Sequence, residues 1–95
     1  MLVTATAELV EFVRLAGGTV WVRCRLRPRC GGVVFLETSV EPPRTWSGYE
    51  PFIVDDILVA ARLPARKRPG ELHLSVEGRR RRRPVASWDG CAFVV

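Results

Sequence analysis

Apolar and polar residues alternate with a period of two through the middle of the chain. In Val20–Arg27 every second residue is small or apolar, and the residues between them are Trp21, Arg23, Arg25 and Arg27. Successive side chains of a strand point to opposite faces. The pattern therefore predicts a strand with one buried face and one cationic face.

A tight reversal and a second strand should follow. Pro28 is expected to end the first strand, because proline has no backbone N–H to donate to a neighbour. Gly31 and Gly32 permit the backbone angles of a tight turn. Residues 33–40 are then predicted to form the second strand of a hairpin, with Cys30 in its mouth.

The segment before this hairpin has helical spacing instead. Its apolar residues recur every three or four positions, at Leu9, Phe12, Val13 and Ala16. We expect either Thr4 or Thr6 to cap the N-terminus of this helix. The glycine pair at positions 17 and 18 should end it.

The rest of the chain reads as short strands joined by loops. Residues 41–51 contain three prolines and are predicted to be a loop. Residues 52–63 should form two strands separated by a turn at Asp55-Asp56, and residues 71–77 and 92–95 two more. The prediction is a single α+β domain, residues 1–95. It has one N-terminal helix packed on a small, mostly antiparallel or mixed β-sheet.

Composition and charge narrow the class of protein. The 95 residues carry a net charge of +5, with 14 arginines and Lys67 as the single lysine. No apolar run approaches the ~20 residues that cross a bilayer. The N-terminus lacks the pattern of a signal peptide, so we expect a cytoplasmic protein without membrane contact. The arginine excess has two alternative interpretations. It either reflects codon usage in a GC-rich genome or serves to attract polyanions.

Two groups of arginines are candidates for binding a partner. One is the cationic strand face formed by Arg23, Arg25 and Arg27. The other is the consecutive run Arg79, Arg80, Arg81, Arg82 and Arg83, which should be exposed because like charges repel one another.

Aromatic residues offer a weaker signal of partner binding. Trp21 lies among the strand arginines, and Trp46 and Tyr49 lie in the proline-rich loop. The loop pair is interpreted first as a cover for the edge of a small core, with partner binding as the alternative.

The cysteines are the candidate metal ligands. Cys24 should point inward from its strand, where a buried thiol usually behaves as a small apolar residue. Cys30 is followed by two glycines and preceded by Arg29, whose positive charge favours the thiolate. His73 is expected to be a solvated surface residue, and Asp55-Asp56 an ordinary turn.

The order of these elements resembles that of the HesB/IscA family, the A-type iron–sulfur carriers. The chain begins Met1-Leu2-Val3-Thr4, then has a helix, a strand, the segment Arg29-Cys30-Gly31-Gly32, a further strand and Glu41-Pro42. That order agrees with the family, and the match beyond Pro42 is looser. The terminal C-G-C pair of the family is absent here, and Cys91 lies a few residues upstream of its place.

The resemblance implies a HesB-like fold and an iron–sulfur cluster or iron held by Cys30 and Cys91, with Cys24 as a further ligand. One subunit supplies too few thiolates for a cluster, so a homodimer would have to pool them, or external thiols complete the shell. The chain would then carry iron without being an enzyme. This fits the lack of a Ser-His-Asp order or a phosphate-cradling glycine loop.

A second hypothesis keeps the fold and removes the metal. In it the chain is an accessory subunit or adaptor that docks on a larger protein or assembly, or on a polyanion, through its arginines. Nonspecific contact with nucleic acid would follow from counterion release.

Overall fold

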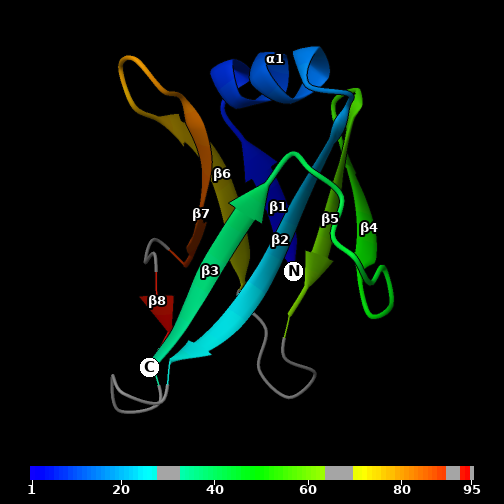
Figure 1. The fold of residues 1–95 in the computed structure, drawn as a ribbon, viewed down its shortest axis with the longest axis vertical. Helices are drawn as coiled ribbons and strands as arrows, with labels where there is room; N and C mark the ends of the chain where they lie inside the picture. Colours follow the sequence, from blue (N-terminus) through cyan, green and yellow to red (C-terminus); the bar gives the residue numbers. More distant parts are fainter. Residues whose placement is uncertain (28–32, 64–69, 90–92, 95) are drawn as a thin grey trace.

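In the computed structural model, residues 1–27, 33–63, 70–89, 93 and 94 are described, and they form one helix and eight strands (Figure 1). The helix is α1 (Ala7–Leu15). The strands are β1 (Leu2–Ala5), β2 (Thr19–Arg27), β3 (Val33–Ser39), β4 (Glu50–Val54), β5 (Ile57–Arg62), β6 (Glu71–Glu77), β7 (Arg83–Trp88) and β8 (Phe93–Val94).

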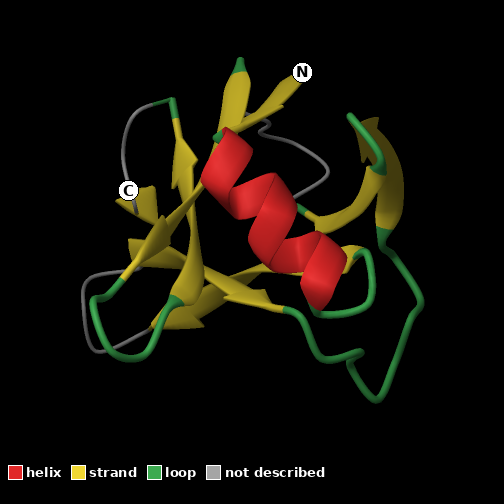
Figure 2. Ribbon diagram, turned by 90° about the horizontal axis from the view of Figure 1, so that it is seen from above, coloured by secondary structure: helices red, strands yellow, loops and turns green. Residues whose placement is uncertain are grey.

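The strands form two sheets. One has the order β1-β6-β7 and the other the order β4-β5-β2-β3-β8. The β1–β6 and β2–β5 pairs are parallel and the remaining pairs antiparallel. Strand β7 lies beside β3, and β1 contacts β4, so the sheets enclose one core. Viewed from above, α1 lies across one end of the strands (Figure 2).

The prediction of an α+β, HesB-like fold with one helix on a single sheet is wrong. The described residues are mostly strand, in two sheets, with one short helix. The sequence pattern does not predict strands β1 and β7. Strand β1 has four residues, too few for a period to show, and β7 contains Pro84, which argues against a strand. It is tolerated because β7 is an edge strand.

Other local predictions are confirmed. The Thr6 hydroxyl caps α1 by accepting a hydrogen bond from the Leu9 N–H at 3.2 Å. The Gly18 N–H donates to the Val13 carbonyl at 2.8 Å, the bond of a glycine C-terminal cap. Strands β2 and β3 pair antiparallel as the predicted hairpin, and β4 and β5 flank the Asp55-Asp56 turn.

The core is built from one side of the helix and one face of each sheet. Its fully buried side chains are Leu9, Val13, Val20, Val22, Ile57, Val59, Leu72 and Leu74. Burial of each such side chain stabilises the fold by about 1.5–3 kcal/mol. The residues that alternate with the β2 valines therefore face outward.

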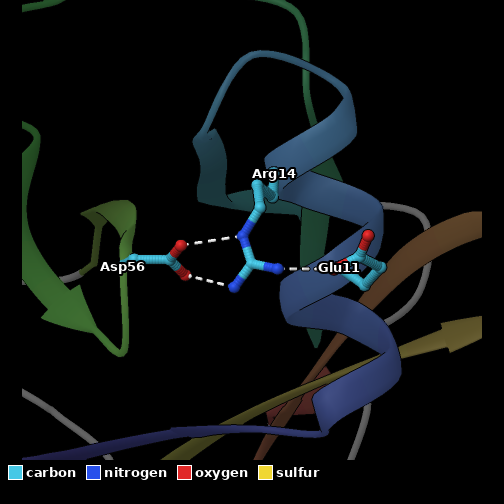
Figure 3. A network of polar contacts seen from close by, with 3 residues as sticks. All are labelled: Glu11, Arg14 and Asp56. Carbon is cyan, nitrogen blue, oxygen red and sulfur yellow. Dashed lines mark hydrogen bonds and ion pairs between the residues drawn. The ribbon is translucent and has the colours of Figure 1, made fainter.

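A three-residue network joins the end of α1 to the β4–β5 turn (Figure 3). The Arg14 guanidinium donates to both carboxylate oxygens of Asp56, at 2.7 and 2.8 Å, and to Glu11 at 2.6 Å. The hydrogen bond from Arg14 lowers the pKa of Asp56, and the same bond raises the pKa of Arg14. The network holds the exposed end of the helix against the hairpin.

We predict that Asp56→Asn lowers the melting temperature slightly at pH 7 and has no effect in acid. The folded-state pKa of Asp56 lies below its ordinary value of 3.8. Its stabilising contribution is therefore complete above that value and disappears as the pH falls through the folded-state pKa. Thermal denaturation of both proteins at neutral and strongly acidic pH measures the difference.

Asp55→Asn is the matched control. Asp55 adopts a positive φ of 52°, which asparagine tolerates, and no ion pair of Asp55 occurs within the described residues. Equal effects of the two substitutions, or a difference that persists in acid, would contradict the prediction.

Candidate binding groove

The predicted metal ligands are mostly outside the part of the chain that is described. Cys30 and Cys91 lie there, so the carrier hypothesis stays a prediction. Cys24 lies on β2 and is half-buried, and burial raises the pKa of its thiol to about 11. No group of three or more His, Cys, Asp and Glu side chains among the described residues could hold a metal ion.

His73 differs from its prediction as a solvated residue. It is partly buried, and its Nδ1 lies 2.8 Å from the Thr4 hydroxyl oxygen. The two residues are register partners in the parallel β1–β6 pair. The histidine therefore ties the first strand of the chain to β6.

Of the three predicted arginines of the cationic strand face, only Arg23 has a described side chain. Arg23 lies on the outer face of β2 and donates to the Glu37 carboxylate on β3 at 2.8 Å. The side chains of Arg25 and Arg27 lie outside the described residues. The cationic strand face thus contains at least one arginine that is paired with a carboxylate.

The consecutive arginines form the turn between β6 and β7, which we call the arginine tip (residues 79–83). All five are exposed, as predicted, although Arg83 already belongs to β7. Arg82 pairs with Glu8 on α1, and Arg83 lies 3.8 Å from Glu77. In the described structure Arg79, Arg80 and Arg81 have no carboxylate partner.

A glycine keeps the arginine tip tightly folded. Gly78 has a φ of +102°, and a Cβ there would lie 2.2 Å from the Arg81 carbonyl oxygen. Only glycine fits so close an approach of the backbone. The turn therefore holds its arginines at the end of a paired hairpin.

Three aromatic side chains meet on the outer face of the larger sheet. The ring centroid of Trp21 on β2 is 5.6 Å from that of Trp46 and 5.3 Å from that of Tyr49, which meets it edge-on. The Trp46 Nε1–H donates to the Pro43 carbonyl at 3.0 Å. We call these three residues the aromatic cluster. Trp46 is 66% exposed, so most of its surface faces solvent.

An open groove of about 950 Å³ runs beside this cluster. Its walls come from β2, β3, the loop at residues 41–45, and the neighbouring ends of β6 and β7. It is lined by Trp21 and Tyr49, by the arginines Arg23, Arg44, Arg62 and Arg83, and by the carboxylates Glu37, Glu41 and Glu77, among others.

The charges in the groove are unevenly paired. Glu37 faces Arg23 and Glu77 faces Arg83, whereas Arg44 and Arg62 have no carboxylate partner in the described structure. The Nε of Arg62 lies 3.4 Å from the position that a Cβ on Gly48 would occupy. Gly48 directly precedes Tyr49 in the chain, so the Arg62 side chain lies close to the aromatic cluster. Unpaired guanidinium groups thus lie beside the aromatic cluster and at the arginine tip, and Arg83 connects the two.

The sequence did not reveal this assembly. In the sequence Trp21 lies among the strand arginines, whereas Trp46 and Tyr49 lie in a separate loop. Arg44 and Arg62 carried no signal, since each is a lone arginine in a different element. Their meeting depends on where the loop folds over the sheet.

Comparison with protein-family models, curated proteins and solved structures found no match. The HesB/IscA resemblance therefore has no support beyond the residues that suggested it. The described residues contain no helix long and apolar enough to cross a membrane.

We predict that Cys24 reacts slowly in the folded protein. A pKa raised from 9.0 to about 11 leaves about 100-fold less thiolate at neutral pH, and the thiolate is the nucleophile. In a variant with Cys30→Ser and Cys91→Ser, iodoacetamide should modify Cys24 about tenfold faster after unfolding in urea, because the higher nucleophilicity of a more basic thiolate offsets part of the difference in thiolate fraction. Mass spectrometry measures both rates, and equal rates would contradict the prediction.

The carrier hypothesis makes its own prediction. Anaerobic reconstitution with iron and sulfide should produce visible absorption bands that Cys30→Ser removes. Cys24→Ser should keep them, because a thiol with a raised pKa is a poor thiolate ligand. A colourless wild-type protein would end the hypothesis.

Proposed function

We propose that the chain is a binding module, not an enzyme, and that it holds nucleic acid through its arginine surface without reading sequence. The observation that carries the proposal is that guanidinium groups without a carboxylate partner in the described structure lie both in the groove and at the arginine tip, and that Arg83, which pairs with Glu77, lies between them. Arg83 belongs to both, with Arg44 and Arg62 at one end and Arg79, Arg80 and Arg81 at the other.

The chemistry of arginine supports phosphate as the bound group. Its guanidinium is planar, permanently charged and forms two parallel hydrogen bonds to a phosphate. Each phosphate that is neutralised releases condensed counterions, which drives association without contact to bases. A net charge of +5 adds long-range attraction for the same ligand.

The carboxylates in the groove limit where phosphates can lie. Glu37 and Glu77 are next to arginines, which reduces their repulsion of an anion. Glu41 has no cationic partner among the described residues, so a phosphate should avoid that end of the groove. We expect the sugar–phosphate backbone to run along the side of the groove that contains Arg62 and then along the arginine tip.

We predict salt-dependent binding of an oligonucleotide of about 16 nucleotides, measured by fluorescence anisotropy. Replacing Arg79, Arg80 and Arg81 together by glutamine should make the slope of log K against log salt less steep by about 2. The slope for single strands is about 0.7 per phosphate contact, and three contacts are removed.

The matched control replaces Arg66, Lys67 and Arg68 by glutamine, which removes the same charge elsewhere in the chain. Its effect should be smaller. Equal losses would mean that binding follows net charge and not the arginine tip. Binding of polyglutamate as tight as that of the oligonucleotide would point to an acidic protein partner and overturn the proposal.

A further inference from the structure

The aromatic cluster has a feature that core packing does not explain. Trp46 is 66% exposed, yet its indole is held by the bond to the Pro43 carbonyl and by contact with Trp21. A side chain that only covered the core would be buried. A large apolar surface that is exposed and already fixed in orientation loses little conformational entropy when it binds a ligand.

We propose that unstacked bases stack on the exposed aromatic cluster at the side of the groove, so that the module prefers single-stranded to double-stranded nucleic acid. This rests on the nucleic-acid binding proposed above and names its substrate. Aromatic side chains beside a cationic groove are the combination that binds single strands, because every base has a face that stacks on an aromatic ring. In a duplex those faces are already covered by neighbouring bases.

The arrangement of charge around the cluster fits a strand laid along it. Arg62 lies against Gly48, next in the chain to Tyr49, and Arg44 lines the same groove two residues before Trp46. Both guanidinium groups lack a carboxylate partner in the described part of the chain. Bases stacked on the rings would therefore have phosphates within reach of unpaired arginines.

The size of the groove also fits. At about 950 Å³ it is at the upper end of the range for pockets that hold drug-sized ligands, so it has room for one or two nucleotides. An acidic peptide would satisfy the arginines but would leave the exposed surface of Trp46 without a stacking partner.

The test compares one oligonucleotide as a single strand and as a duplex, with wild-type protein and Trp46→Ala. The substitution should weaken single-strand binding about tenfold, the loss of one stacked base, and change duplex binding less than twofold. Trp46→Phe, which keeps a ring, should restore part of the lost affinity. Because Trp46 is exposed, the fold should survive its replacement.

Intrinsic fluorescence gives a second readout. Stacked bases should quench Trp21 and Trp46, whereas Trp88 is buried in β7 and should be unaffected. The quenching should be smaller in Trp46→Phe. Leu15→Ala, which removes an apolar side chain that is 80% exposed on α1, is the control and should change neither affinity nor quenching.

The outcomes separate this inference from the proposed function. No binding of either nucleic acid would overturn both. Equal binding of the single strand and the duplex, with no effect of Trp46→Ala, would leave nucleic-acid binding standing and overturn the stacking role. An equal loss for both ligands on Trp46→Ala would overturn it as well.

Discussion

The register of β2 is the constraint on which the rest of the structure depends. The strand lies between β5 and β3, and its residues Val20 and Val22 are fully buried on its inner face. A slip of one residue would expose both valines and turn Trp21 and Arg23 into the core. Each buried valine contributes about 1.5–3 kcal/mol, and an unpaired buried charge costs several kcal/mol more. The two penalties act in the same direction, so the outward position of Trp21 follows from the packing beneath it.

That register also determines which side chains surround Trp21. Arg23 is paired in the sheet with Glu37 on one side and Arg62 on the other. Like charges on adjacent strands are destabilising, and Glu37 offsets this for Arg23 by an ion pair. Arg62 has no carboxylate partner within the described residues. Its charge is thus left to solvent or to an anionic ligand, beside the rings that give the groove its apolar wall.

Local signals predicted the local structure well. The Thr6 cap, the glycines after α1, the alternation in β2 and the Asp55-Asp56 turn each depend on a few neighbouring residues. The arrangement of the strands into two sheets does not depend on neighbouring residues. Strand β1 forms because Leu2–Ala5 pairs with β6 about seventy residues away, and the aromatic cluster forms because a loop folds back over β2. Such partners are determined by tertiary packing. The sequence pattern therefore predicts one helix on a single sheet and does not show that the strands divide into two sheets.

Pro84 explains both why the sequence does not predict strand β7 and where the groove forms. Its carbonyl accepts a hydrogen bond from the Thr38 hydroxyl at 2.6 Å, so this edge of β7 faces β3. In a strand the N–H and carbonyl of one residue point to the same side, and proline has no N–H. Backbone pairing between β7 and β3 therefore lacks a donor at this point, and a side chain makes the contact instead. The two sheets meet there without a regular ladder, and the groove lies at this junction, where Pro84 and Val85 line it together with Trp21 and Tyr49.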